Sequence, residues 1–530
     1  LETDNDTASA VGIFGTTNLV LPEISAPNGT VSLGRPGNLE DLITSDITQT
    51  SGTAVIADTL SINADVASST SSNPTTAVLT ESGNKFNNLG EIVVGDDGDT
   101  TFDLDLFDST GGLKLTDNIL LAGGLKIETK GEPLELSTFD VLADGDISLD
   151  GDGVTMDTAS NVNADNTGTG TGDGGTLTID GGEQALELRG TLRSDSTSAM
   201  AMEIVNGTDL ELGDVEALNG TVALGTTARP LTGAVTQETD GSFVAKTLVG
   251  NVDDALTLDQ GVKLDQLGTL AVDGAFTLDD IGEANSGTSN EGLLFVGDVT
   301  ALSTAHISSD GTVDLQAYDL NASGNAITIT GVGIRQRYTA DGTGTSDSAI
   351  SATTATLDAG SGDLLLGSAS NNFTGSVTPI SSGDYALVRN ANDFSTAPLA
   401  DKVGDTTNLT LIAGGSLSLS TEAVSLTTGS IDLRSLSGDL RTPGRLETTT
   451  GNVDLYASGE LTLANSVVSD TSGNITVDGG LISSPSGSAY QLETAGAGDI
   501  KVTARDGNFT QGSDFDYITV DGDITLNATA

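Results

Sequence analysis

A five-residue unit recurs along the whole chain: a glycine, a polar residue, an apolar residue, any residue, and a second apolar residue. Three copies stand close together and begin at Gly451, Gly459 and Gly473. Further copies begin at Gly29, Gly145, Gly175, Gly220, Gly268, Gly274, Gly311, Gly415, Gly429 and Gly498. The apolar-x-apolar pattern places two side chains on one face of a strand. Each copy therefore predicts a turn and a short strand, with the glycine at positive φ and a neighbouring Asn or Asp favouring the turn.

The spacing of these copies distinguishes between the possible all-β architectures. The copies at Gly429, Gly451 and Gly473 follow one another at a constant interval, and those at Gly498 and Gly522 follow at slightly longer ones. A period in the low twenties with two or three strands is typical of one turn of a parallel β-helix. Immunoglobulin-like domains would repeat near roughly 100 residues and propeller blades near about 40 to 50. At about 22 residues per coil, the chain would form about 24 coils.

We expect one continuous β-solenoid over residues 1–530, because a single coil cannot bury its apolar face without neighbours. Polar, glycine-rich stretches interrupt the repeat and are predicted to be corner loops. They lie near residues 68–76, 165–175, 283–291 and 339–348. The alternative is that these stretches link separate domains. The chain begins at Leu1, and the copy at Gly522 lies close to Ala530. We therefore expect a segment excised from a longer protein.

The charge and the amino-acid composition exclude several classes of protein. The formal net charge is -57, from 76 acidic and 19 basic residues, so binding to nucleic acid is not expected. The longest apolar runs are a few residues, so membrane insertion is not expected either. Cysteine is absent, which excludes disulfides and zinc–thiolate sites. High charge with 3% aromatic residues also fits disorder, but a sustained two-residue apolar period argues for a fold.

Longer phrases also occur in the chain, among them "GNITVDGG" from Gly473 and "GDITLNATA" from Gly522. Two more contain Asn-x-Phe, "GNKFNNLGEIVVG" from Gly83 and "NNFTGSVTPISSGDYALVRNANDF" from Asn371. These phrases resemble the repeats of filamentous haemagglutinin-like large exoproteins. The resemblance implies a right-handed parallel β-helix on the exterior of a Gram-negative bacterium. It also implies export through an outer-membrane transporter of the two-partner type, and a role as an adhesin or surface fibre.

One family feature is not found in this chain. The amino-terminal secretion domain of the family carries Asn-Pro-Asn-Gly and Asn-Pro-Asn-Leu motifs. Here only "APNG" occurs, from Ala26 to Gly29, and it reads as an ordinary turn. The secretion domain is therefore expected to be missing from this segment or strongly divergent. Autotransporter passengers and phage tailspikes share the same architecture.

Catalytic residues are not predicted. His306 is the only histidine, and no Gly-x-Ser-x-Gly elbow accompanies it, so it is read as a surface side chain. The enzymatic alternative is a polysaccharide-cleaving β-helix, for which paired acids exist at Asp96–Asp97, Asp253–Asp254 and Asp279–Asp280. Gly-His-Gly is absent, and Arg335-Gln336-Arg337 is the nearest approach to an Arg-x-Lys pair. Tryptophan, a usual platform for sugars, is absent as well.

Calcium is the one cofactor that the sequence allows, with ligands that it does not identify. Carboxylates and turns cluster in Gly95–Asp105 and in Ala143–Gly153. Neither segment fits the EF-hand loop or the glycine-rich calcium nonapeptide, so solvated acidic turns are the simpler reading. Thr167–Gly175 superficially resembles a phosphate loop but lacks the Gly-Lys-Ser/Thr ending.

These observations favour a structural and interaction protein. We expect an elongated spacer in an extracellular bacterial surface fibre or adhesin, which binds an unknown receptor or glycan through loops or a flat face. Self-association through unpaired terminal strands is a further expectation. The first alternative is a secreted or phage-borne glycan-active enzyme, for which a groove with three or more converging carboxylates and a basic partner would be required. The second is a calcium-dependent surface-layer or filament subunit.

Overall fold

The computed structural model is all-β in the residues that it describes, with parallel strands stacked in about 20 turns. The predicted parallel β-solenoid is therefore confirmed. The chain forms two compact units: unit 1 is Leu1–Asp265 with Ala284–Ser286, and unit 2 is Gln266–Glu283 with Gly287–Ala530. The described residues are 1–3, 10–35, 43–64, 75–94, 102–109, 111–164, 174–197, 200–282, 292–337, 347–485, 490–512 and 515–529.

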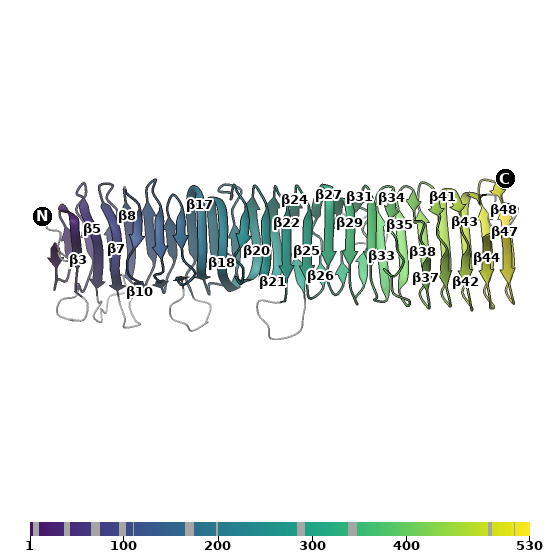
Figure 1. The fold of residues 1–530 in the computed structure, drawn as a ribbon, viewed down its shortest axis with the longest axis horizontal. Coiled ribbons are helices and arrows are strands. Elements are labelled where there is room, and N and C mark those ends of the chain that lie inside the picture. The colour runs from purple at the N-terminus through teal and green to yellow at the C-terminus, as the bar shows by residue number, and fades with distance from the viewer. Residues whose placement is uncertain are drawn as a thin grey trace. The chain divides into compact units, whose positions relative to one another are not determined.

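Unit 1 is built from parallel strands, coloured purple to teal in Figure 1, and most of them pair with a strand two or three places farther along the chain. Its strands are β1 (Val11–Ile13), β2 (Leu19–Leu21), β3 (Ile24–Leu33), β4 (Ile47–Gln49), β5 (Val55–Ala64), β6 (Thr75–Leu79), β7 (Lys85–Val94), β8 (Phe102–Asp108), β9 (Leu113–Leu115), β10 (Ile119–Leu121), β11 (Leu125–Thr129), β12 (Leu134–Ser137), β13 (Val141–Ala143), β14 (Ile147–Asp150), β15 (Val154–Met156), β16 (Asn161–Asn163), β17 (Leu177–Arg193), β18 (Met202–Leu224), β19 (Val235–Gln237) and β20 (Phe243–Val252). The boundary between the units falls within β21 (Leu256–Val272).

Unit 2 repeats the same construction. Its strands are β22 (Phe276–Asp280), β23 (Leu293–Phe295), β24 (Val299–Ala301), β25 (Ala305–Ser309), β26 (Val313–Asp314), β27 (Leu320–Thr330), β28 (Ile334–Arg335), β29 (Ile350–Asp358), β30 (Leu364–Leu366), β31 (Asn372–Phe373), β32 (Ser376–Ile380), β33 (Tyr385–Asn390), β34 (Phe394–Thr396), β35 (Asn408–Ala413), β36 (Leu417–Ser418), β37 (Val424–Leu426), β38 (Ile431–Ser435), β39 (Leu440–Thr442), β40 (Leu446–Thr448), β41 (Val453–Leu463), β42 (Val467–Ser469), β43 (Ile475–Ser483), β44 (Tyr490–Thr494), β45 (Ile500–Ala504), β46 (Phe509–Thr510), β47 (Phe515–Thr519) and β48 (Ile524–Ala528). Strands β37, β40, β42, β44 and β47 form a separate sheet.

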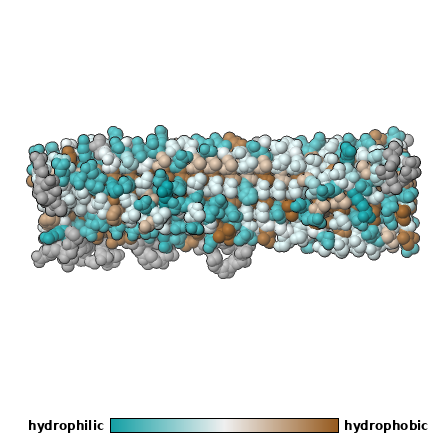
Figure 2. Space-filling view, viewed as in Figure 1, coloured by the Kyte–Doolittle hydropathy of each residue, from teal (hydrophilic) through white to brown (hydrophobic). Residues whose placement is uncertain are grey.

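The register of the strands places the apolar residues of successive coils on top of one another. In unit 2, Val453 of β41 pairs with Ile475 of β43, which pairs with Ile500 of β45. All three side chains are fully buried. Burying one such side chain contributes roughly 1.5–3 kcal/mol, and neighbouring coils supply most of the cover. The face shown in Figure 2 is correspondingly mainly hydrophilic or intermediate, with hydrophobic residues confined to scattered places.

Glycine is required at the repeat positions because a side chain would not fit between the coils, and not because the backbone has positive φ. We predicted positive φ for them, and this is wrong: positive-φ glycines occur elsewhere, for example at Gly324. A Cβ on Gly451 would lie 2.1 Å from the carbonyl oxygen of Gly429 one coil earlier, and a Cβ on Gly473 would lie 1.7 Å from that of Gly451. The same clash recurs at Gly498 and Gly522, at 2.2 and 2.0 Å. Each glycine therefore allows two coils to approach closely.

The polar residue after each repeat glycine connects one coil to the next. The backbone N–H of Asn474 donates to the side-chain oxygen of Asn452 at 2.9 Å, and that of Asp499 donates to Asn474 at 2.9 Å. Asp523 continues the ladder by donating to Asp499, again at 2.9 Å. At the corner, the backbone N–H groups have no partner in the hydrogen bonds between strands. A side-chain oxygen that accepts such an N–H group therefore satisfies it.

The asparagines of two Asn-x-Phe phrases, Asn84 and Asn371, each form a pair with the side-chain amide of a glutamine. In unit 1, Asn84 and Gln49 exchange two hydrogen bonds of 2.7 and 2.9 Å. In unit 2, Asn371 and Gln336 exchange two of 2.8 and 3.0 Å. Asn84 and Asn371 are fully buried, and each also accepts a backbone N–H, from Val55 and Ile350 respectively. Such fully bonded buried amides specify one register of the coils.

The coils are longer and fewer than predicted. Hydrogen bonds between equivalent corner residues span 21 residues from Asp103 to Gly124 and 30 residues from Asp146 to Thr176. Coils of such different length explain why the chain makes about 20 turns and not about 24. The predicted loop near 283–291 and the greater parts of those near 68–76, 165–175 and 339–348 lie outside the described residues. Continuity over residues 1–530 stays a prediction.

Candidate functional site

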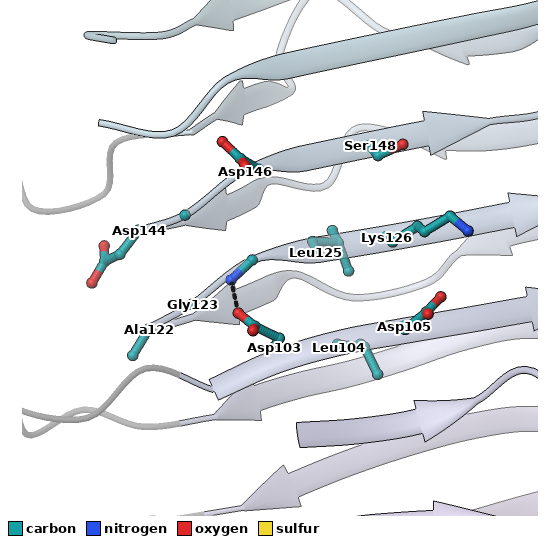
Figure 3. Close-up of a pocket in the computed structure, with 12 residues that line it drawn as sticks. Asp103, Leu104, Asp105, Ala122, Gly123, Leu125, Lys126, Asp144, Asp146 and Ser148 are labelled. Atoms are coloured by element: carbon teal, nitrogen blue, oxygen red, sulfur yellow. Dashed lines mark hydrogen bonds between the residues drawn. The ribbon is translucent and has the colours of Figure 1, made fainter. Parts of the chain in front are cut away.

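Unit 1 contains a groove of about 530 Å³ where β8, β11 and β14 begin (Figure 3). Its charged and polar lining residues are Asp103, Asp105, Lys126, Asp144, Asp146 and Ser148. A volume of this size falls within the range of small-ligand pockets, about 300–1,000 Å³. The groove is therefore a candidate binding site in unit 1.

Glycines hollow out the corner at which this groove lies. Gly123 and Gly124 leave no side chains there, and a Cβ on Gly123 would lie 2.4 Å from the carbonyl oxygen of Phe102. Asp103 accepts the backbone N–H of Gly124 at 2.7 Å, as the dashed line in Figure 3 shows. Asp146 accepts the N–H and the hydroxyl of Thr176 at 2.7 and 2.9 Å. Two of the four carboxylates in the groove are therefore engaged in holding the next coil.

A row of three carboxylates lies on β11, β14 and β17. On β11 and β14 it is two residues beyond Lys126 and Ser148 of the groove. Glu128 of β11 pairs in register with Asp150 of β14, which pairs with Asp180 of β17. Glu128 accepts a hydrogen bond from Lys126 at 3.2 Å. Asp180 is bound by Arg229 at 3.2 Å. We call Glu128, Asp150 and Asp180 the carboxylate row.

The carboxyl group of Asp150 has a raised pKa. Burial is the largest cause, and together with the negative charges of Asp180 and Glu128 it raises the pKa to about 6. The positive charges of Lys126 and Arg229 act in the opposite direction and are not sufficient to compensate. A carboxyl group with such a pKa exchanges its proton near neutral pH, which general acids require.

The groove and the carboxylate row can together offer several hydrogen-bond acceptors and one ammonium group to a small polar ligand. In Figure 3, Asp144 and Asp146 lie near the glycine corner, whereas Lys126 and Ser148 lie farther along their strands. The carboxylates are therefore distributed along the groove, and they do not surround a single point. Such an arrangement suits a ligand with spaced hydroxyl or amino groups better than a single ion.

A second groove, of about 510 Å³, lies in unit 2 at a similar glycine pair. Gly414 and Gly415 form its corner, with Asn392, Asp393 and Ser437 beside them. Asp393 accepts the N–H of Ser416 at 2.5 Å, as Asp103 does for Gly124. In both grooves a glycine pair therefore lies beside an acid that anchors the following coil.

His306 and the Arg335–Arg337 triplet lie apart from any catalytic arrangement. His306 is exposed on β25, where its register partners are Thr277 and Thr328. Arg335 forms an ion pair with Asp314 at 2.7 Å, and Gln336 belongs to the buried amide pair. Arg335 and Gln336 therefore bond to residues of neighbouring coils, and His306 is a surface side chain, as predicted.

Two of the three predicted acid pairs lie in the described residues, and one of these has its carboxylates on opposite faces of a strand. Asp253 and Asp254 are exposed in a turn after β20. Asp279 faces outwards at the end of β22, whereas Asp280 is buried and accepts the hydroxyl of Ser309 at 2.9 Å. Adjacent residues of a strand point to opposite faces, so these two carboxylates cannot converge. Asp96–Asp97 lies outside the described residues.

Calcium stays a prediction. Residues 95–101 of the first candidate segment are not described, and 102–105 begin β8. Ala143–Gly153 forms the corner and strand that supply Asp144, Asp146 and Asp150. Within the described ranges, no group of three or more His, Cys, Asp or Glu side chains is arranged to hold a metal ion. Thr167–Gly175 is described only at its last two residues.

The carboxylate row was missed from the sequence, although a signal for it exists. Glu128, Asp150 and Asp180 each follow directly after the second apolar residue of a strand, in "LKIE", "ISLD" and "LTID". The alignment of these strands, and hence the stacking of the acids, required the coil lengths. The interval from Glu128 to Asp150 is much shorter than that from Asp150 to Asp180, so a fixed period does not align the three acids.

No protein-family model, curated protein or solved structure matches this chain. Among the described residues, no helix is long and apolar enough to cross a membrane. The class that the fold defines is therefore the parallel β-solenoid, and the filamentous haemagglutinin-like resemblance stays a prediction.

Proposed function

We propose that this chain is a structural and interaction segment of a bacterial cell-surface fibre or adhesin, in which stacked coils act as a spacer. The observation that supports the proposal is the corner ladder of unit 2. Asn452, Asn474, Asp499 and Asp523 are engaged in holding successive coils together. In this part of unit 2, polar corner residues thus join successive coils, as a spacer requires.

The partners in this proposal follow from the same reading. The net charge of -57 keeps such a stack soluble and repels anionic surfaces. A receptor or glycan would bind through a lateral face or a corner groove. Export through an outer-membrane transporter of the two-partner type and an extracellular location belong to the proposal through the family resemblance.

Immunogold electron microscopy on intact producing cells tests this function. An antibody raised against the chain should label surface filaments on intact cells, and permeabilised cells serve as the control for total antigen. Label that appears only after permeabilisation would overturn the proposal. Beads coated with the purified chain should also adhere to target cells, and soluble chain should compete with them.

A glycan-active enzyme is the second candidate, because the groove in unit 1 combines several carboxylates with Lys126 and lies next to Asp150. Release of reducing ends from a panel of neutral and acidic polysaccharides is the direct assay. Activity that disappears in both Asp150→Asn and Asp105→Asn would favour the enzyme. Absence of release from every polysaccharide would leave the spacer as the better reading.

A further inference from the structure

The carboxylate row contains an electrostatic asymmetry. Its outer members have basic partners: Glu128 is bonded to Lys126, and Asp180 is bonded to Arg229. Asp180 also accepts hydrogen bonds from the side chain of Asn206 and the backbone of Gly182, at 2.9 and 3.0 Å. The middle member, Asp150, has no comparable side-chain partner among the residues that the structure describes.

We propose that the carboxylate row is a proton-sensitive clasp between three successive coils of unit 1. When Asp150 carries a proton, β11, β14 and β17 are held together without electrostatic repulsion. When Asp150 is ionised, three negative charges stack on adjacent strands and loosen this part of the stack.

The spacing of the strands makes the repulsion substantial. Neighbouring strands lie about 4.8 Å apart, so in-register side chains on one face are close neighbours. Like charges directly opposite one another destabilise a sheet. Since Asp150 is half-buried, water screens its interactions with Glu128 and Asp180 incompletely.

The charged groups that face Asp150 come from three segments. Lys126 and Glu128 face it from β11, Asp180 faces it from β17, and Arg229 reaches it from the segment after β18. Of these, the two cations are already engaged with the outer carboxylates. Their charges therefore reduce the repulsion on Asp150 without removing it.

The direction of the pH effect follows from linkage. The pKa of Asp150 is raised from an ordinary 3.8 to about 6 in the folded chain. The folded state therefore binds this proton more tightly than the unfolded state does. The stabilisation is fully present below pH 3.8 and is lost as the pH rises through about 6.

Hydrogen exchange of the whole chain between pH 5.0 and 7.5, corrected for intrinsic exchange rates, tests the clasp. Protection of peptides that cover β11, β14 and β17 should fall about threefold as the pH rises, because the raised pKa alone would give about tenfold over this interval and solvent screening reduces the effect. In Asp150→Asn, protection of these peptides should be independent of pH. Asp454→Asn, which removes an outward-facing acid of β41 in unit 2, is the matched control and should leave the profile of unit 1 unchanged.

Two results would overturn the proposal. One is protection in the natural chain that does not vary between pH 5.0 and 7.5. The other is an identical pH dependence in Asp150→Asn. Far-ultraviolet circular dichroism and protection in unit 2 establish that the variant is folded, so that a flat profile can be assigned to the missing carboxyl group.

Discussion

Replacement of Gly473 by Asn tests the physical reason for the repeat glycines. A Cβ at this position would lie 1.7 Å from the carbonyl oxygen of Gly451, whereas real contacts of this kind are not shorter than 3.0 Å. The two coils would therefore have to separate by more than one ångström at this corner. The hydrogen bond from Val453 N–H to the Asn474 carbonyl is 2.9 Å long and would be broken by such a shift.

The expected cost follows from these contacts. Forcing extra atoms into a packed site costs about 1–3 kcal/mol, and each hydrogen bond lost between the coils costs about 1 kcal/mol more. We expect Gly473→Asn to destabilise this part of unit 2 by about 3 kcal/mol. That corresponds to exchange of the affected amide groups on the order of 100-fold faster.

The matched control is the same substitution at Gly324, also in unit 2. Gly324 has φ +87°, and a Cβ there would meet nothing within 4 Å. Asn tolerates the left-handed region better than most residues, so the cost should stay below about 1 kcal/mol. Hydrogen exchange monitored over residues 451–480 and 320–330 compares the two variants. If Gly473→Asn is as well tolerated as Gly324→Asn, close approach is not what requires the repeat glycines.

Three further predictions concern polar groups. Asn371→Leu should destabilise unit 2 by about 3 kcal/mol, because the buried amide of Gln336 loses its partner. Urea titration measures this, and an unchanged midpoint of the unfolding transition would contradict it. Asn474→Ala should cost at most about 1 kcal/mol in the same assay, because water can replace an exposed corner bond; a cost as large as that of Asn371→Leu would contradict it. Lys126→Met should raise the pKa of Asp150 above its value of about 6, because the positive charge of Lys126 lowers that pKa. Titration of the carboxyl group by nuclear magnetic resonance measures the shift, and a lower pKa of Asp150 in the variant would contradict the reasoning.

The apolar alternation and the period in the low twenties were sufficient to predict a parallel β-solenoid. Val453, Ile475 and Ile500 illustrate the reason. Each belongs to a copy of the same short unit, and only stacking buries such a unit. This inference depends on local pattern and on the hydrophobic effect, both of which can be read from the residue order.

The contacts between coils were decided by the tertiary structure alone. The sequence showed a glycine followed by a polar residue in each copy of the unit, and it suggested a backbone turn. Only the stacked coils show that Gly473 leaves room for a carbonyl group and that Asp499 accepts a backbone N–H from the next coil. The carboxylate row had the same limit: Asp150 and Asp180 are separated by an unusually long coil, yet they lie in register. The number of residues per coil varies along the chain. Which side chains meet between neighbouring coils therefore depends on the residue at which each coil is completed, and packing determines that residue.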